Sequence, residues 1–243
     1  MNAVEVDGLT FSYVNGPRVL EDICFELPAG EILVIAGLSG CGKTTLCHII
    51  SGIIPNAIKG DVIGSIKVMD IDPREAGLPQ SALRAGYVFQ DADSQIICST
   101  VEDELAFGLE NLGYPPGKIR FRVNELSSEF GFDDLLLTNP ALLSGGQKKL
   151  LTIAAVLATA PPVLVLDEPL SSLDAEGRGL VRTALERQRD QGRAVIIVEH
   201  DLNLVTFADN WLLLTDGAVA AHGTPEEFLP EFEDVLRELG VWE

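Results

Sequence analysis

The sequence predicts an α/β fold built on a mostly parallel sheet, with a small antiparallel β region before that sheet. Four short apolar runs indicate buried parallel strands, because each is apolar on both faces and most precede a helical stretch. These runs are residues 32–36, 163–166, 194–198 and 211–214. Three segments, residues 4–10, 23–27 and 63–69, tend to alternate in polarity and are separated by Gly, Pro and Asp, as antiparallel strands are.

Helix signals are concentrated in the middle of the chain, from about residue 91 to residue 142. Residues 99–102, Ser-Thr-Val-Glu, match a capping box that opens an amphipathic run through Leu109. Further helices are predicted over residues 118–130 and 148–160. We therefore expect one domain over residues 1–243, in which a helical subdomain at about residues 91–160 is inserted into the α/β core.

Composition and charge narrow the class of protein. With 47% hydrophobic residues, 243 residues can form a substantial core, but the longest apolar run, residues 150–160, is too short to cross a bilayer. No amino-terminal secretory signal is recognisable, so we expect a soluble or peripheral protein. The net charge of −20 disfavours binding to nucleic acid and to anionic lipid, because both are negatively charged. A role at the membrane therefore requires a protein partner. An alternative interpretation is that the acidic surface serves only solubility, or adaptation to a salt-rich cytoplasm.

The four cysteines, Cys24, Cys41, Cys47 and Cys98, lack the spacing of metal ligands. Unpaired thiols in or near a core are the expected condition. Cys41 is the exception, because it lies within a glycine-rich loop before a helix, where the helix N-terminus favours a reactive thiolate.

That glycine-rich loop, residues 37–45, predicts phosphate binding. It fits the pattern G-x-x-x-x-G-K-[ST] between a buried strand and a helix, so its backbone N–H groups and the helix dipole favour phosphate. Lys43 is expected to reach the β- and γ-phosphates, Thr44 to ligate Mg²⁺ and Thr45 to touch the α-phosphate. The nucleotide-binding residues predicted in the loop are Gly37, Ser39, Gly40, Cys41, Gly42, Lys43, Thr44 and Thr45.

An acidic pair follows the apolar run at residues 163–166. Asp167 is expected to hold Mg²⁺ opposite Thr44, and the adjacent Glu168 is expected to polarise the attacking water as general base. Without the phosphate loop, an ordinary acidic loop after a buried strand is the better interpretation. With the loop, the pair predicts the metal and base of a nucleotide hydrolase.

Gln90 and His200 also follow apolar runs and, taken singly, are typical of surface polar residues. Because the carboxyl ends of parallel strands share one edge of a sheet, we expect both residues at the same edge as Asp167. There the Gln90 amide is expected to sense Mg²⁺ and water, and the His200 imidazole to donate to the γ-phosphate.

The segment Leu-Ser-Gly-Gly-Gln at residues 143–147 predicts a second anion site. It precedes a long helix, so the Ser144 hydroxyl and the backbone N–H groups of Gly145, Gly146 and Gln147 are available to an anion. One domain already holds its phosphates with the loop at residues 37–45. A second site therefore requires a second nucleotide, or a nucleotide held by another subunit.

With these motifs the chain resembles the ATP-binding cassette (ABC) ATPases, the P-loop nucleotide-binding subunits of ABC transporters, over nearly its whole length. The resemblance implies ATP and Mg²⁺ as cofactors and two subunits packed head to tail. Ser144 and Gly146 of one subunit then contact the γ-phosphate held by Lys43 of the other. By the same resemblance, Tyr13 matches the aromatic residue that stacks on adenine, Gln90 matches the Q-loop glutamine, and His200 matches the switch histidine. Asp167 and Glu168 match the Walker B aspartate and the catalytic glutamate. Residues 143–147 match the signature, and residues 171–174, which end in Asp174, match the D-loop.

The stretch from residue 89 to residue 113 is similar to the ATPases of energy-coupling factor transporters. Those importers take up vitamins and transition-metal ions such as cobalt or nickel. The resemblance implies a second ATPase subunit, identical or paralogous, a transmembrane coupling protein and a substrate-capture protein, at the cytoplasmic face of the membrane and without nucleic acid. Gln95 is expected near the groove for the coupling protein's helix. A helical entry shared with other importers explains the same stretch.

A soluble, non-transport ABC ATPase is the competing function. The chain lacks the long coiled-coil insertion of DNA-linked ABC ATPases and the second cassette of translation-linked ABC ATPases. Only the sequence of residues 89–113 argues against a role in iron–sulfur assembly. Another ABC transporter class is a further alternative. A purely structural role is disfavoured, because every motif residue is present.

The carboxy-terminal end departs from the family pattern. Family members often carry an added region there that helps the ATPases dimerise, whereas this chain stops at Glu243 after an amphipathic stretch at residues 228–242. That stretch is either a packed terminal helix or a short dimer contact. We expect dimerisation without ATP to be weak.

Overall fold

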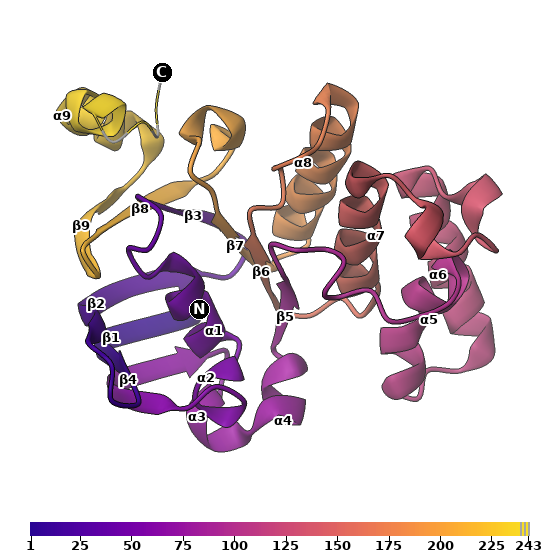
Figure 1. Cartoon of the computed structure of the whole chain (residues 1–243), viewed down its shortest axis with the longest axis horizontal. Helices are drawn as coiled ribbons and strands as arrows, with labels where there is room; N and C mark the ends of the chain where they lie inside the picture. The colour runs from indigo at the N-terminus through magenta and orange to yellow at the C-terminus, as the bar shows by residue number, and fades with distance from the viewer. Residues whose placement is uncertain (239, 241, 243) are drawn as a thin grey trace. The chain divides into compact units, whose positions relative to one another are not determined.

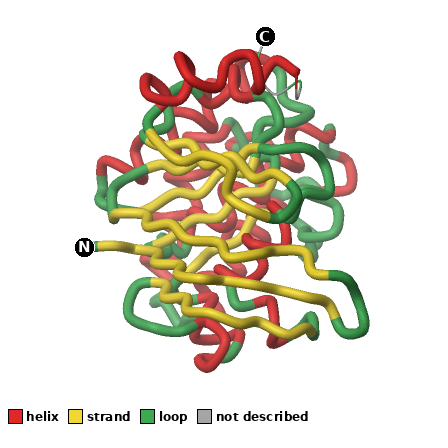
Figure 2. The backbone as a smooth tube through the Cα atoms, turned by 90° about the vertical axis from the view of Figure 1, so that its left-hand side faces the viewer, coloured by secondary structure: helices red, strands yellow, loops and turns green. Residues whose placement is uncertain are grey.

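The computed structural model describes residues 1–238, 240 and 242, and its strands form two sheets (Figures 1 and 2). The smaller sheet has the order β2-β1-β4, and β1 pairs with both neighbours in antiparallel fashion. Its strands are β1 (Asn2–Tyr13), β2 (Arg18–Pro28) and β4 (Gly60–Val68). In β1 and β2 buried and more exposed positions tend to alternate, which is why the sequence predicted an antiparallel region with one face covered.

The larger sheet has six strands in the order β5-β6-β7-β3-β8-β9. Its parallel part is confirmed by the pairing of β6 with β7, β7 with β3 and β3 with β8. Every residue of β3, β6 and β7 is buried, which accounts for their continuous apolar runs. The edge strand β9, antiparallel to β8, was not predicted, because its small residues are at most half-buried and form no strong apolar pattern. The strands are β3 (Ile32–Ala36), β5 (Ala85–Val88), β6 (Val163–Asp167), β7 (Ala194–Val198), β8 (Asn210–Thr215) and β9 (Ala218–Gly223).

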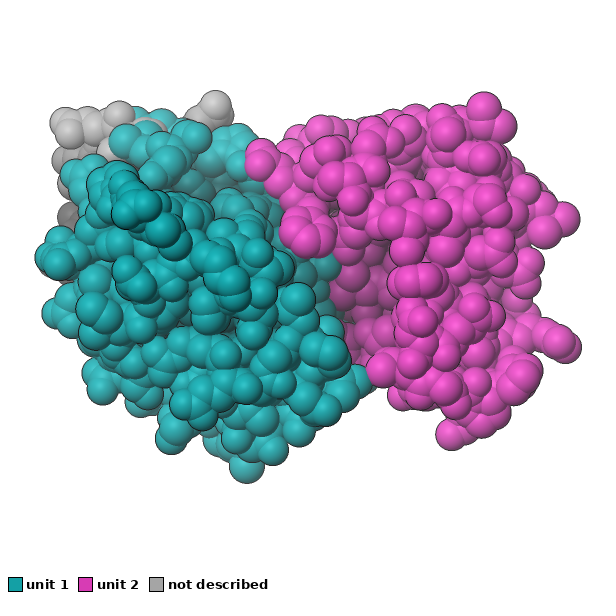
Figure 3. All heavy atoms as spheres, turned by 60° about the horizontal axis from the view of Figure 1, so that its bottom comes forward, with its two compact units in different colours: residues 1–87, 162–168, 185–243 teal, residues 88–161, 169–184 magenta. Residues whose placement is uncertain are grey.

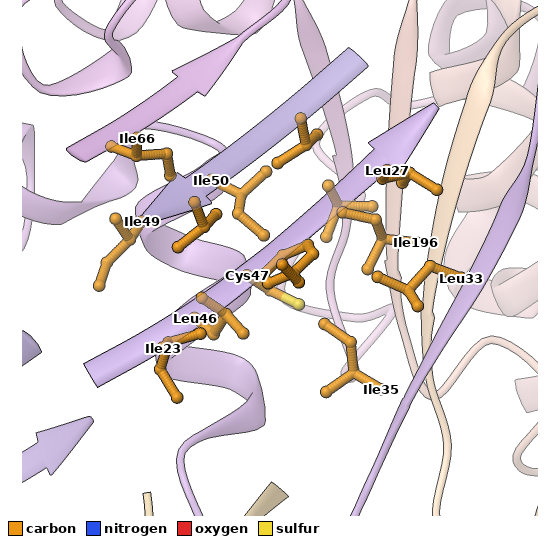
Figure 4. Close-up of a cluster of buried hydrophobic side chains, with 14 of the residues drawn as sticks. Ile23, Leu27, Leu33, Ile35, Leu46, Cys47, Ile49, Ile50, Ile66 and Ile196 are labelled. Carbon is orange, nitrogen blue, oxygen red and sulfur yellow. The ribbon is translucent and has the colours of Figure 1, made fainter. Parts of the chain in front are cut away.

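Helix α1 (Lys43–Ile50) joins the two sheets into one hydrophobic core. Its apolar side chains lie among residues of both sheets: Leu46, Cys47, Ile49 and Ile50 with Ile23, Leu27 and Ile66 of the smaller sheet and Leu33, Ile35 and Ile196 of the larger one (Figure 4). Because α1 is held from both sides, the loop that precedes it has a fixed base. The fold thus positions residues 37–42 before any ligand is considered.

The chain divides into two compact units (Figure 3). The first comprises residues 1–87, 162–168 and 185–243, and the second comprises residues 88–161 and 169–184. Helices of the second unit are α5 (Val101–Asn111), α6 (Pro116–Phe130) and α7 (Gly145–Ala158), with the short η1 (Asp133–Leu135) and η2 (Pro140–Leu142); α8 (Ala175–Asp190) begins there and ends in the first unit. The first unit also holds α2 (Ile53–Asn56), α3 (Pro73–Ala76), α4 (Leu78–Ala82), η3 (Leu202–Val205) and α9 (Pro225–Glu238).

Three helix N-termini differ from the predicted ones. Helix α5 is capped by Thr100, whose Oγ1 accepts from the Asp103 N–H at 3.1 Å, so the predicted capping box at residues 99–102 was wrong by one residue. Helix α6 begins at Pro116, two residues early, because proline suits the first helical turn. Helix α7 begins at Gly145 rather than residue 148, because Ser144 caps it.

The amphipathic stretch at residues 228–242 falls mainly on α9. Phe228 and Leu236 are buried, and the Phe228 ring meets Trp211 of β8 edge-on at 6.0 Å between centroids. Residues 239, 241 and 243 lie outside the described residues, and a dimer contact by this stretch stays a prediction. Within the described part of the chain, no helix has both the length and the apolarity needed to span a membrane.

Candidate active site

Three neighbouring strands of the larger sheet end at one level. Asp167 of β6 pairs with Val198 of β7, and Val198 pairs in turn with Ile35 of β3. The phosphate loop leaves β3, Glu168 follows β6, and the segment with His200 follows β7. The carboxyl edge of this parallel sheet therefore gathers three of the predicted segments, as expected for a ligand site in an open α/β sheet.

The conformation of the phosphate loop requires glycine at two positions. Gly37 has φ +144°, and a Cβ there would lie 2.2 Å from the Leu214 carbonyl oxygen. Gly42 has φ +106°, and its Cβ would lie 2.6 Å from Leu20 Cδ2. Both positions exclude larger residues through contacts within the chain itself, so the loop's shape is a property of the folded first unit.

Lys43 is buried at the inner side of this loop. Its Nζ donates to the carbonyl oxygens of Gly37 at 2.7 Å and Leu38 at 2.9 Å, and lies 3.9 Å from Cys41 Sγ. The carbonyls stabilise an ammonium that burial would otherwise penalise. The same ammonium, held among loop backbone groups and one thiol, is suited to a phosphate bound by the loop.

Thr44 and Asp167 meet as predicted across the loop and β6. The Thr44 hydroxyl donates to Asp167 Oδ2 at 2.8 Å, and the Tyr87 hydroxyl donates to the same oxygen at 3.2 Å. Asp167 is 2% exposed, so its carboxylate is aligned by hydroxyl groups rather than by water. A hydroxyl and a carboxylate are oxygen ligands of the kind that Mg²⁺ prefers, and this pair fits that ion.

The groups behind Asp167 are uncharged near neutral pH. Burial raises the pKa of the Tyr87 hydroxyl, and the Asp167 carboxylate adds to the effect as a nearby charge and as a hydrogen-bond acceptor. Burial also raises the pKa of the Cys47 thiol and lowers that of His48, which tilts against the Tyr87 ring with 5.3 Å between centroids. Tyr87 therefore stays protonated and able to donate to Asp167.

Glu168 and His200 form a second polar pair at this edge. Glu168 has φ +48°, an uncommon conformation for a non-glycine residue, and its N–H donates to the Val198 carbonyl at 3.0 Å. Its Oε1 lies 3.9 Å from His200 Nδ1, and Oε2 of the fully buried Glu199 lies at the same distance from that nitrogen. A partly exposed carboxylate beside an imidazole can accept and donate protons.

Tyr13 lies beside the start of α1. Its hydroxyl is 3.1 Å from Thr45 Oγ1, and its ring packs edge-on against Phe11 with 4.8 Å between centroids. The side of β1 that carries Tyr13 thus adjoins the phosphate loop. Because the residue is 37% exposed, ring surface remains for stacking with a planar ligand.

The signature segment, residues 143–147, is a reciprocal helix cap in the second unit. Ser144 Oγ accepts from the Gln147 N–H at 3.2 Å, and Gln147 Oε1 accepts from the Ser144 N–H at 2.9 Å. The Ser144 hydroxyl accepts in this cap and keeps its own proton for another acceptor. A Cβ on Gly145 would meet nothing within 4 Å, and one on Gly146 would make only ordinary contact at 3.5 Å with Leu173.

Asp174 and Gln90 also belong to the second unit. Asp174 Oδ1 accepts from the Gly177 N–H at 2.8 Å, which caps the first turn of α8. Gln90 is exposed just after β5, and its carbonyl accepts from Lys149 Nζ at 2.7 Å. The first unit thus brings together Tyr13, residues 37–45, Asp167, Glu168 and His200, and the second holds Gln90, the signature segment and Asp174.

The comparison with known families decides the class of this site. A family model described as ABC transporter matches residues 20–171, more than half of the chain. The chain belongs to the ABC transporter ATPase family. It is accordingly an ABC transporter ATP-binding subunit and an enzyme that hydrolyses ATP, which confirms the prediction made from the motifs.

Individual relatives of this ABC ATPase cover nearly all of it. A provisionally named ABC transporter ATP-binding protein, PF0068 of Pyrococcus furiosus, is 38% identical over 98% of the chain and 94% of the relative. Energy-coupling factor transporter ATP-binding protein EcfA1 of Caldanaerobacter subterraneus is 36% identical over 98% and 86%. The structure of CbiO1 from Clostridium perfringens, part of the ABC transporter complex CbiONQ, superposes with a TM-score of 0.80 at 31% identity over 99% and 95%. Some relatives are longer: the chain spans 39% of one from Methanosarcina acetivorans.

Two buried residues that contact predicted site residues, one in each unit, were not predicted from the sequence. Nothing in the sequence singled out Tyr87, although its hydroxyl donates to Asp167 Oδ2. Lys149 was treated as one residue of a predicted helix, although it is buried and bonded to the backbone of Phe89 and Gln90. A lysine in an otherwise apolar helical face was the one signal that pointed to it.

Proposed function

We propose that this chain is the ATP-hydrolysing subunit of an energy-coupling factor importer for a vitamin or a transition-metal ion. It acts with a second ATPase subunit, identical or paralogous, and with a transmembrane coupling protein and a substrate-capture protein at the cytoplasmic face of the membrane. The EcfA1 relative and the CbiO1 structure support this class, together with residues 89–113. Exposed apolar side chains of the second unit, among them Ile97, Phe121 and Leu142, are consistent with protein partners.

The two-subunit mechanism rests on one observation, namely that the first turn of α7 has room for a side chain at its glycines. No contact among the described residues requires glycine at Gly145 or Gly146, whereas such contacts do require it at Gly37 and Gly42 of the phosphate loop. A helix N-terminus that keeps two unneeded glycines and a donor hydroxyl suits the close approach of an anion from outside the chain. We assign that anion as the γ-phosphate of ATP held by Lys43 of the second subunit.

Nucleotide binding is assigned to the first unit. The backbone N–H groups of residues 37–42 surround the phosphates, Lys43 leaves its carbonyl partners to bind the β- and γ-phosphates, and Thr45 contacts the α-phosphate. Tyr13 offers its ring to adenine. The short distance between the Tyr13 hydroxyl and Thr45 supports one continuous site for base and phosphate.

Thr44 and Asp167 would hold Mg²⁺, with Gln90 of the second unit as an additional ligand or sensor. Bound there, the ion would neutralise phosphate charge. The hydrogen bond between Thr44 and Asp167 supports this assignment because both oxygens already converge. Tyr87 keeps the carboxylate in that orientation.

Hydrolysis is assigned to Glu168 and His200. Glu168 accepts a proton from the attacking water, and His200 donates to the γ-phosphate as negative charge develops on its oxygens. The Glu168 N–H is bonded to the Val198 carbonyl, and Glu168 Oε1 lies 3.9 Å from His200 Nδ1, which supports the pairing of the two side chains. Lys43 and the partner subunit's signature segment add charge stabilisation in the transition state.

Mixing two inactive variants tests the two-subunit site. Ser144→Ala leaves a subunit with an intact phosphate loop and base, and Glu168→Gln leaves one with an intact signature. If the signature acts on the opposite subunit, the mixed dimer regains one complete site and hydrolyses ATP, although each variant alone loses about 10²-fold or more in kcat. A mixture as inactive as its components would place the signature's action within its own chain.

Ser144→Ala alone adds a second measurement. The isolated variant should bind ATP within about twofold of the unmodified chain, because the cap's only other partner is Gln147 and the phosphate loop is untouched. Equal losses of ATP binding and hydrolysis would contradict a role limited to the dimer.

The importer class is tested by co-purification. A tagged chain expressed in its native cells should bring down from detergent-solubilised membranes a coupling protein and a small substrate-capture protein. An assembly with iron–sulfur proteins, or with a permease of another ABC class, would overturn the energy-coupling factor assignment and leave the ATPase assignment intact.

A further inference from the structure

Lys149 is a buried charge that the proposed ATPase mechanism does not use. It is 3% exposed and lies on α7, one helical turn after Gly145. Its Nζ donates to the carbonyl oxygens of Phe89 at 3.1 Å and Gln90 at 2.7 Å. A buried ammonium is costly unless hydrogen bonds replace its water, so these backbone contacts stabilise its position.

The segment that Lys149 holds is fixed by side chains of the second unit at several points. Gln95 Oε1 accepts from the Phe89 N–H at 2.9 Å, so both backbone groups of Phe89 are bonded. Asp93 receives a hydrogen bond from Lys148 Nζ at 2.6 Å. All three of these hydrogen bonds from Lys148 and Lys149 run from α7 to residues 89–93, the short segment that contains Gln90. The segment is therefore attached to the signature helix, 59 residues away in sequence from Gln90 to Lys149.

We propose that Lys149 is a positioning residue that holds the Gln90 backbone to α7, so that Gln90 and the signature segment move as one body. Helix α7 is continuous from Gly145 to Ala158, and Lys149 lies about 6 Å along its axis from the capped first turn. A displacement of Gln90 by nucleotide is therefore transmitted to Ser144 through a short, hydrogen-bonded path. The inference rests on the proposed roles of Gln90 and Ser144.

Lys148 provides the matched comparison within the same helix. Both residues are lysines bonded to the segment after β5, but the partner of Lys148 is a side chain that is 71% exposed, whereas Lys149 bonds to backbone. Ion pairs with exposed partners contribute little, so loss of the Lys148 bond should leave the segment in place. Loss of Lys149 removes donors from two backbone carbonyls at once.

The experiment compares the full-length Lys149→Met and Lys148→Met variants. Amide hydrogen exchange of residues 89–95 should become roughly tenfold faster in Lys149→Met, with little change across the rest of α7 and almost none in Lys148→Met. ATP affinity of the isolated Lys149→Met subunit should stay within about twofold, while kcat and the cooperativity of hydrolysis fall. A merely structural role would accelerate exchange throughout α7 instead of in this segment.

A milder variant, Lys149→Gln, keeps an amide donor and should show intermediate exchange and an intermediate kcat if Lys149→Met does not fold. Unchanged exchange at residues 89–95 in a folded Lys149 variant, or equal effects of the Lys148 and Lys149 substitutions, overturns the proposal. The exchange measurement does not depend on hydrolysis. Failure of the mixed-dimer test would remove the proposed two-subunit mechanism, whereas failure here would remove only the link between Gln90 and α7.

Discussion

The phosphate loop and the signature segment are both glycine-rich turns before a helix, yet they differ in what demands their glycines. At Gly37 and Gly42 a side chain would collide with Leu214 or Leu20, and both residues have positive φ. At Gly145 a side chain would meet open space. The phosphate loop is shaped by contacts within its own unit, whereas the described residues place no such constraint on Gly145 at the start of α7. The difference supports the proposal that the phosphate loop holds this chain's own nucleotide and that the signature segment acts on a nucleotide held by a second subunit.

The polar groups of the phosphate loop and of the signature segment also differ in where their hydrogen-bond partners lie. Lys43 and Thr44 are bonded to Gly37, Leu38 and Asp167 within the first unit, so the phosphate loop belongs to a connected network. The Ser144 hydroxyl accepts from the Gln147 N–H in its cap and keeps its own proton for another acceptor. Removal of groups in the first network should alter binding or chemistry in the isolated chain. Removal of groups in the second should matter only when two chains meet.

The largest effect is expected at Glu168. Glu168→Gln should lower kcat by about 10²–10⁴-fold because the amide cannot accept the proton of water. Binding of ATP is untouched, so the variant should accumulate as an ATP-bound dimer in size-exclusion chromatography with ATP and magnesium. Normal hydrolysis by this variant would remove Glu168 from its assignment as base.

The glycines provide the direct test of the comparison. Gly37→Ala should destabilise the chain by about 2 kcal/mol or more, because its Cβ would overlap the Leu214 carbonyl. Gly145→Ala should leave the free energy of unfolding within about 0.5 kcal/mol, yet impair ATP-dependent dimer formation. Urea unfolding measures the first quantity and ATP-dependent association the second. If Gly145→Ala associates normally, the open first turn of α7 is not a contact surface for nucleotide.

A smaller, local effect is expected at Cys41. Alkylation of this buried thiol, 3.9 Å from Lys43 Nζ, should be slowed severalfold by bound ATP, because the loop then closes around phosphate. Exposed Cys24 serves as the control and should be labelled at the same rate with and without ATP. If bound ATP leaves the labelling rate of Cys41 unchanged, this loop does not contact the phosphates.

The smallest effect concerns pH and is confined to the first unit. Burial lowers the pKa of His48 below its ordinary value of 6.5, with Asp167 acting in the opposite direction, so the folded chain holds fewer protons at this site than the unfolded chain. The neutral imidazole's contribution is present above pH 6.5 and is lost as the pH falls through the folded-state value. His48→Gln should flatten this part of the pH dependence of urea unfolding. An unchanged slope would show that His48 titrates equally in both states.

The sequence predicted the larger sheet well because its strands are continuous apolar runs bounded by motif residues. It failed at β9, whose Ala-rich run has no strong pattern, and at the N-terminus of α5, where two adjacent hydroxyl residues, Ser99 and Thr100, both suit a cap. The cap depends on which residue meets a free N–H in space. Local sequence alone does not distinguish the two.

The sequence by itself determined which candidate groups are present: a glycine-rich loop, an acidic pair, a histidine after a buried strand and the segment at residues 143–147, each recognisable from neighbouring residues. Tertiary structure decided which groups meet. Tyr87 and Asp167 are 80 residues apart, and Lys149 and Gln90 are 59 apart, so no local pattern records either contact. It also decided that the Leu214 carbonyl requires glycine at residue 37, while no described residue lies close enough to require it at residue 145. A motif can be recognised from neighbouring residues because it depends on the geometry of one short piece of backbone. The alignment of a carboxylate or a loop depends instead on packing between segments that are distant in sequence.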